Sequence, residues 1–385
     1  MFGQKGINPI ISAVLVLIIS VTGISLVLDV GMPAVERSRE NALFDEARRN
    51  INLLRETLEE IEFGANGTSR TVALDVTDGA YSINGSENSI SFSHQLETSI
   101  LSPELCHWDG NVLTRTFGSG RVLDTRFKEG EGNETMDCSR HENDGKIKGA
   151  NWTETSRGKV LQFDGVDDEV VVPDDASLDK KDFTVTAWVN WRAGPEDIYS
   201  SLENEGSFIF GALENYGLAA VEDGGEIYIK GGFYDEESND VAIKSNETLD
   251  NHTWYHTAFV YDVESEEARI YIDGELSGNI SHDTPPKTDD KNKSIGYVPD
   301  SIKDSYGPWE GYIDDVRLYE RSLPEEKVEV IYRGGSLGSQ ERLDIKLPFK
   351  EVDLTNSTEL NKGRHNLLVK NRGQDGKVNI ETRLL

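Results

Sequence analysis

The residues of this chain that suit chemistry are mainly oxygen-bearing side chains that fit a hard cation. In the stretch GYIDDVRLY, Asp314 is expected on the same strand face as two aliphatic residues. A core-facing carboxylate is costly unless it is hydrogen-bonded or bound to a metal. The loop DCSRHENDG adds Asp137 and Asn143, and the stretch FDG adds Asp164. The sequence therefore predicts one structural calcium ion held by these four residues, with backbone hydrogen bonds to Asp314 as the alternative.

Catalysis is not expected from the motifs of this chain. The sequence has no E-x-D-x-x-E arrangement that would place a glycosidase's carboxylates together on one strand. It also lacks G-x-S-x-G, a glycine-rich phosphate loop and H-E-x-x-H. Acidic pairs such as Asp167-Asp168 are expected in solvated turns. We therefore predict no enzyme, no catalytic residue and no bound organic cofactor, although carboxylates distant in sequence could converge.

Aromatic side chains near predicted loops suggest a different chemistry, because a flat ring can stack on a sugar. The candidates for sugar contact are Trp191, Tyr199, Tyr216, Tyr234 and Trp309. Packing at the surface is the alternative for each of them. Trp188 and Trp254 are expected in the core. His252 and His256 flank Trp254 but have no third ligand at metal spacing, so both are expected to be structural.

Short strands must position these residues. In DFTVTAWVNW, alternate residues from Phe183 to Trp191 are expected on one face. WYHTAFVYD and ARIYIDGEL alternate in the same way, and the latter turns at Asp273-Gly274. Many short strands with polar turns predict an antiparallel sandwich in the block 121–335.

The order of motifs in this block gives a resemblance to a known family. VLQFDGVDDEVVVP, FTVTAWVNW, TWYHTAFVYD, IYIDGEL and GYIDDVRLYERSLPEEKV follow one another as in the laminin-G-like jelly roll of the concanavalin A-like lectin/glucanase superfamily. The resemblance implies two curved antiparallel sheets, often a structural calcium ion, and often binding of carbohydrate or glycoprotein. One departure is the loop at 137–144, which has Arg140, His141 and Glu142 where the family is usually richer in glycine.

Charge, cysteines and asparagines limit the partners and the compartment. The 385 residues carry a formal net charge of −31, so nucleic acid is not an expected partner. Cys106 and Cys138 could form a disulfide worth about 3–4 kcal/mol, or remain two unrelated buried thiols. Nine sequons support export and a glycoprotein. Their asparagines are Asn66, Asn84, Asn133, Asn151, Asn246, Asn251, Asn279, Asn292 and Asn356.

The N-terminus carries a predicted membrane segment. Residues 7–28 are uncharged and would span about 33 Å as a helix, which is enough to cross a bilayer. We expect a transmembrane helix over 7–30 with the rest of the chain outside. The order Lys5-Gly6-Ile7 before the apolar run resembles the leader of archaeal type IV pilin-like proteins. That resemblance implies a leader at 1–6 that is cleaved between Gly6 and Ile7; an uncleaved anchor is the alternative.

The remaining segments complete the predicted architecture. An amphipathic helix is expected over 31–63, from apolar residues at three- and four-residue steps. They are Val35, Ala42, Leu43, Ala47, Ile51, Leu54, Leu58 and Ile61. The strand patterns at 337–385 are too short to bury a core alone, so we expect them to complete the sheet begun at 68–100. Segments 64–120 and 337–385 would then form one small β domain into which the block 121–335 is inserted. The fold class is mainly β, with a pilin-like N-terminal helix and an antiparallel jelly roll.

These features predict a membrane-anchored or pilus-associated cell-surface protein that displays a lectin-like domain for adhesion. Its expected partners are the membrane, surface glycans or glycoproteins, and other pilin subunits. Two alternatives stay open. The jelly roll could be a glycosylated spacer without a specific ligand, or it could be a degenerate glycosidase.

Overall fold

The computed structural model describes residues 32–96, 105–118, 120–192, 206–212, 215–288, 290–297, 307–335, 337, 342–349, 353–371 and 377–383. The chain divides into two compact units, one formed by Met1–Thr114 with Gly338–Leu385 and the other by Arg115–Leu337. The predicted leader, cleavage position and transmembrane segment lie outside the described residues. Among the residues that are described, no helix is both long enough and apolar enough to cross a membrane.

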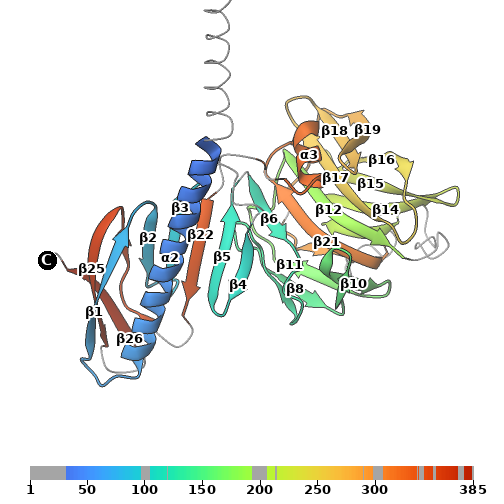
Figure 1. The fold of residues 1–385 in the computed structure, drawn as a ribbon. Helices are drawn as coiled ribbons and strands as arrows, with labels where there is room; N and C mark the ends of the chain where they lie inside the picture. Colours follow the sequence, from blue (N-terminus) through green and yellow to red (C-terminus); the bar gives the residue numbers. More distant parts are fainter. Residues whose placement is uncertain are drawn as a thin grey trace, which may run out of the picture. The chain divides into compact units, whose positions relative to one another are not determined.

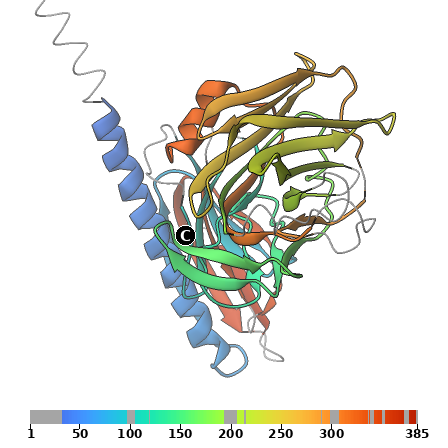
Figure 2. The same ribbon diagram turned by 90° about the vertical axis from the view of Figure 1, so that its right-hand side faces the viewer.

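The first unit contains a long amphipathic helix. Helix α2 (Met32–Glu62) lies along the strands of this unit (Figures 1 and 2). Six of the eight apolar residues expected on its buried face are buried, among them Ile51, Leu54 and Leu58. The other two, Val35 and Ala42, are exposed, so the expectation was wrong for the first part of the helix.

The strands of this unit form two sheets. The first has the order β1 (Ser69–Val76), β25 (Gly363–Asn371), β26 (Lys377–Arg383), β23 (Asp353–Leu354). The second has the order β24 (Thr358–Leu360), β2 (Ala80–Asn84), β3 (Ser89–Gln95), β22 (Arg342–Pro348), β5 (Val112–Phe117), β4 (Cys106–Asp109). Strand β1 pairs with β25 and β3 with β22. Strands from both ends of the chain therefore share these sheets, and the central block is enclosed between them in sequence.

The second unit is an antiparallel sandwich of two sheets. The sheet that we call the β12 sheet has the order β19 (Glu275–Ser281), β18 (Glu267–Ile272), β17 (Trp254–Asp262), β12 (Phe183–Trp191), β21 (Glu310–Tyr319), β10 (Gly158–Asp164), β9 (Asn151–Thr155), and β6 (Arg121–Thr125) also pairs with β21. The β14 sheet has the order β16 (Asp240–Thr248), β15 (Glu226–Tyr234), β14 (Tyr216–Asp223), β13 (Ser207–Gly211), β20 (Lys293–Ile295), β11 (Glu169–Val172), β8 (Gly145–Lys148), β7 (Glu134–Thr135). This architecture agrees with the predicted sandwich.

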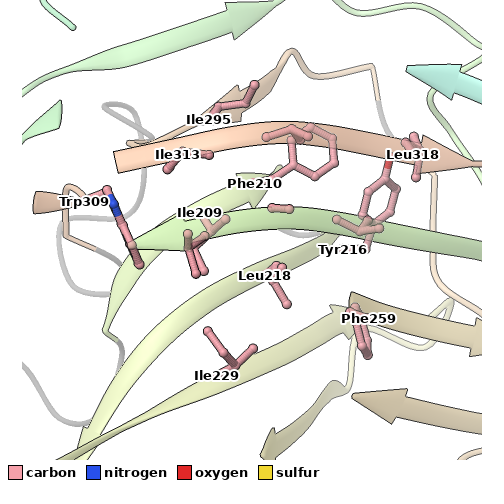
Figure 3. Packing of buried hydrophobic residues seen from close by; sticks show 14 of the residues in the cluster. Ile209, Phe210, Tyr216, Leu218, Ile229, Phe259, Ile295, Trp309, Ile313 and Leu318 are labelled. Carbon is pink, nitrogen blue, oxygen red and sulfur yellow. The ribbon is translucent and has the colours of Figure 1, made fainter. Parts of the chain in front are cut away.

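The core of the sandwich lies between its two sheets. Phe259 and Ile313 from the β12 sheet pack in one cluster with Ile209, Leu218 and Ile229 from the β14 sheet (Figure 3). The residues of β12 expected on one face are all buried in this cluster, which confirms the alternation read from the sequence. They are Phe183, Val185, Ala187, Val189 and Trp191.

A short helix covers part of the opposite face of the β12 sheet. Helix α3 (Glu325–Tyr332) buries Val328 and Ile331 in a small cluster with residues of β17, β18 and β21. The predicted turn after β18 brings the hairpin tip up to this helix. Asp273 and Gly274 both have positive φ, and a Cβ on Gly274 would lie 3.1 Å from the Cα of Glu329. Glycine at this turn therefore permits the close approach of α3.

Both cysteines of the chain are disulfide-bonded and neither is free. Because the sequence contains only two, the predicted pairing of Cys106 with Cys138 is confirmed.

Candidate ligand-binding site

The outer face of the β12 sheet, which points away from the core, carries the residues of the candidate site. Between the core residues of β12 lie Thr186, Trp188 and Asn190, which project to this side. In the sheet register Trp188 stands opposite His256 on β17 and opposite Asp314 on β21. Three adjacent strands therefore place an indole, an imidazole and a carboxylate next to one another on this face.

A β-bulge in β21 changes the face on which Asp314 lies. Thr186 pairs with Arg317 and Trp188 with Asp314, so β21 has one extra residue between these two pairs. Within this bulge the backbone of Asp315 adopts a left-handed conformation, with φ of 50°. Ile313 lies in the core, and Asp314 does not. The expectation that Asp314 shares a face with the following aliphatic residues was therefore wrong, because simple alternation does not pass through a bulge.

Asp314 is held by two cations. Lys128 Nζ lies 2.9 Å from Asp314 Oδ1, and Arg157 Nε lies 2.9 Å from Asp314 Oδ2. Arg157 Nη2 also pairs with Asp315 Oδ2 at 3.1 Å. Burial raises the pKa of Asp314 to about 6, and the Asp315 charge adds to the rise, against the opposing effect of Lys128 and Arg157. This carboxylate thus serves to fix Arg157 on the outer face.

Arg157 belongs to a layer in which cations and aromatic rings alternate. Its guanidinium lies 3.8 Å from the ring centre of Trp188 and 5.5 Å from that of Trp254. Trp188 stacks on Tyr332 from the end of α3, with ring centres 5.7 Å apart. Trp254 stacks at 6.0 Å on Tyr312 of β21. Such contacts at partly desolvated sites are worth about 0.5–2 kcal/mol each, so this layer has a defined geometry.

A cleft of about 740 Å³ opens between this layer and the end of α3. Its volume falls within the range of roughly 300–1,000 Å³ that is common for ligand pockets. The lining residues are Arg157, Thr186, Trp188, His256, Asp315, Arg317, Ile331, Tyr332, Arg333 and Gly334.

Buried polar atoms without a partner lie on this face. Both ring nitrogens of His256 and the hydroxyl of Thr186 have no hydrogen-bond partner within the described part of the chain, and the same holds for Asn190 Oδ1. His256 is 1% exposed. Its main chain is fixed, because its N–H donates to Asp273 Oδ1 at 2.8 Å. Burial lowers the pKa of His256 to about 3, so the imidazole is neutral at pH 7 and offers one N–H donor and one acceptor nitrogen.

Arginine side chains outnumber carboxylates in the lining of the cleft, and each of these arginines is ion-paired. Three arginines and one carboxylate, Asp315, contribute to it. Arg317 is anchored from behind by Asp124, with Arg317 Nε 3.3 Å from Asp124 Oδ1. Burial opposes ionisation of Asp124, but the surrounding guanidinium groups hold its pKa below its usual range. Arg333 is mostly exposed and pairs with Glu329 one helical turn earlier at 2.6 Å.

The predicted sugar-contacting residues are not the residues that line the cleft. Trp191 and Trp309 pack edge to face in the core with ring centres 4.9 Å apart, and Tyr216 is buried with its hydroxyl donating to Leu178 O. The prediction was wrong for these three, because their rings pack in the core cluster and do not line the cleft. Tyr234 is exposed on β15, and Tyr199 lies outside the described residues.

The predicted calcium ligands are largely engaged elsewhere. Asp137 accepts hydrogen bonds from the main-chain N–H groups of Asp124, Ser139 and Asn143 and from the Ser139 hydroxyl. The Asn143 amide donates to Val122 O and to Ser177 Oγ. Together with the ion-paired Asp314, these groups do not fit a shared calcium site.

Asp164, the fourth predicted ligand, lies in a different acidic group. One carboxylate oxygen from each of Asp164, Asp167 and Asp168 lies within 4.8 Å of the others. Burial raises the pKa of Asp168, and the charges of the other two carboxylates raise it further. Three hard oxygen ligands at this spacing suit calcium by their chemistry.

Sequence reasoning missed the main residues of the cleft, although part of the signal was present. Trp188 was expected in the core, yet it is one residue out of phase with the core-facing set of β12. That phase alone indicates the outer face. Arg157 and Tyr332 come from a turn and a helix far apart in the chain, and no local pattern connects them.

Comparison with solved structures finds many of similar fold. The binding domain of Paraclostridial Mosquitocidal Protein 1 is 14% identical, with a TM-score of 0.44 over 55% of this chain and 52% of that chain. The botulinum neurotoxin serotype G binding domain is 15% identical, with a TM-score of 0.43 over 55% and 50%. Domain 4 of AbnA, an extracellular arabinanase from Geobacillus stearothermophilus solved with arabinotriose, is 16% identical, with a TM-score of 0.38 over 55% and 98%.

These likenesses carry no argument about function, and the matched region spans only about half the length of the toxin domains. No curated protein matches the chain. A family model does match: residues 164–329 fit Laminin_G_3, the concanavalin A-like lectin/glucanases superfamily. The family predicted for the central block is therefore confirmed over residues 164–329.

Proposed function

We propose that this chain is a cell-surface protein whose sandwich unit binds carbohydrate or glycoprotein without catalysis, and that the cleft on the outer face of the β12 sheet is the binding site. The N-terminal segment would anchor the unit in the membrane or in a filament of pilin-like subunits. Its biological role would be adhesion.

The cleft is the observation that carries this proposal. It joins aromatic walls to buried polar atoms that lack partners, and these are the two kinds of group that a sugar needs. A buried polar atom without a partner costs about 1–3 kcal/mol, so a ligand that satisfies Thr186 and His256 would recover part of that cost. The lectin-type family match at 164–329 supports the same class of ligand.

The charges of the cleft favour binding over glycoside hydrolysis. Hydrolysis requires two carboxyl groups on either side of the scissile bond, about 5–10 Å apart. The described lining provides one carboxylate, Asp315, and this group is paired with Arg157 and lies 3.4 Å from Arg317 Nη2.

The positions of the sequon asparagines support display outside the cell. All nine lie in the described structure, and none belongs to the buried core. An exported chain would thus offer these residues to glycosylation.

The mature N-terminus tests the pilin-like part of the proposal. Mass spectrometry should find a chain that starts at Ile7, and a chain that starts at Met1 or Phe2 would favour the uncleaved anchor.

A glycan array with the full chain tests the binding function. We expect a discrete set of glycans to bind, and we expect Tyr332→Ala to abolish binding because it removes one wall of the cleft. The matched control is Tyr228→Ala, which removes a partly exposed ring beside Lys244 on the β14 sheet. If no glycan on the array binds the chain, the proposal is overturned in favour of a spacer without a specific ligand. Loss of binding in the control alone would place the site on the other sheet.

A further inference from the structure

We propose that the cleft is selective for an acidic sugar, whose carboxylate or sulfate group binds among Arg157, Arg317 and Arg333 while the sugar ring lies against the Trp188 and Tyr332 walls. This inference rests on the proposed function and names its ligand class.

The sign of the charge in the cleft is the first argument. The whole chain has 70 acidic and 39 basic residues, yet the cleft lining has three arginines and one aspartate. The arginines of the lining act on an anion over a few ångströms, whereas the more distant acidic surface is screened by salt beyond about a Debye length, so the lining favours anions at close range.

The fixed positions of two guanidinium groups are the second argument. Arg157 is fixed by Asp314, Asp315 and the Trp188 ring, and Arg317 is fixed by Asp124. Guanidinium groups that are held before the ligand arrives lose little freedom on binding, and their planar donors match carboxylate or sulfate oxygens. Arg333 stands at the exposed rim, where it can meet the anion as it enters.

The neutral groups of the cleft are the third argument, and they favour a sugar over a bare inorganic anion. A small anion would use the arginines but would leave Thr186 and His256 unpartnered. Hydroxyl groups on a ring that bears the anionic group could reach both residues from the same cleft. A neutral imidazole can donate to one hydroxyl and accept from another.

Isothermal titration of the full chain with three oligosaccharides tests the inference. One carries a uronic acid, one carries a sulfate, and one is neutral with the same backbone. We expect either acidic form to bind at least about 10-fold more tightly than the neutral form, since charge-assisted hydrogen bonds are stronger than neutral ones. The comparison of the first two identifies the anionic group.

The Arg333→Gln variant tests the role of the rim. Arg333 is mostly exposed, so its loss should leave folding intact. We expect roughly 5- to 10-fold weaker binding of the acidic oligosaccharide and unchanged binding of the neutral one. The matched control is Lys146→Gln, which removes one positive charge from an exposed residue of β8 in the β14 sheet. Affinity should also fall as ionic strength rises, because the attraction is electrostatic.

The outcomes separate this inference from the proposed function. Binding of the neutral form as tightly as the acidic forms would overturn the inference and leave the function in place. Equal effects of Arg333→Gln and Lys146→Gln would do the same. Absence of binding to all three and to the glycan array would overturn both.

Discussion

The two faces of strand β12 differ in what their burial achieves. On the inner face the residues from Phe183 to Trp191 that point inward pack in the core, and the indole Nε1 of Trp191 is the one side-chain polar atom among them. On the outer face Thr186 and Asn190 are buried as well, but each carries a polar atom without a described partner. Burial of the first kind stabilises the fold, and burial of the second kind costs free energy. The unpartnered Thr186 and Asn190 atoms of the outer face therefore support the proposed role of that face in binding.

The largest expected effect comes from opening a cavity on the inner face. Phe259 is fully buried, with its ring centre 5.5 Å from that of Phe183. We expect Phe259→Ala to lower the free energy of unfolding by about 3–5 kcal/mol. Denaturant unfolding followed by tryptophan fluorescence measures it, because five of the six tryptophans lie in the sandwich unit. Trp254→Ala, a partly exposed ring of the outer face, is the control and should cost less; equal losses would contradict the contrast between the faces.

A single polar atom placed on the inner face should also be costly. Val185 is fully buried in the core cluster. We expect Val185→Thr to lower the free energy of unfolding by about 1–3 kcal/mol, because the new hydroxyl has no partner there. The same unfolding measurement checks it, and a neutral result would show that the inner face tolerates polar groups as the outer face does.

The two titrating residues of the outer face should have opposite effects on the pH dependence of stability. His256 has a pKa lowered from 6.5 to about 3, so its stabilising contribution is lost as pH falls below 6.5. Asp314 has a pKa raised from 3.8 to about 6, so its contribution is lost as pH rises through this window. The two effects oppose each other between about pH 4 and pH 6, each with a slope of at most about 1.4 kcal/mol per pH unit.

Variants separate these two contributions. Relative to the unchanged chain, the stability of His256→Gln should fall as pH rises from about 4 to 6, and that of Asp314→Asn should rise. Chemical denaturation at a series of pH values measures both. Parallel profiles for the two variants would contradict the assignment of opposite signs.

We further predict calcium binding at a third place, the Asp164, Asp167 and Asp168 group, with a smaller effect on stability. If this group binds calcium, the unfolding temperature of the full chain should rise with added calcium and fall with a chelator. Asp167→Asn changes an exposed member of the group and should reduce the shift. An unfolding temperature that changes neither with added calcium nor with the chelator would contradict calcium binding by this group.

The sequence predicted the architecture better than the site, and the reason is physical. Alternation along β12 and the Asp273-Gly274 turn are local patterns, so the sandwich and its core face could be predicted. The bulge at Asp315 is not visible in a pattern of period two, and it reversed the predicted face of Asp314. The cleft unites Arg157, Trp188 and Tyr332 through tertiary structure alone. Proximity to a predicted loop was a poor guide to exposure, as the buried Trp309 shows.

One paired measurement on Thr186→Val tests the central claim most directly. The substitution replaces the unpartnered hydroxyl by a methyl group of similar size and leaves the inner face unchanged. We predict a free energy of unfolding that is unchanged or up to about 1 kcal/mol higher, together with weaker binding of the uronic-acid oligosaccharide in calorimetry. A loss of stability with unchanged affinity would contradict the account, because it would show that the outer face serves the fold and not the ligand.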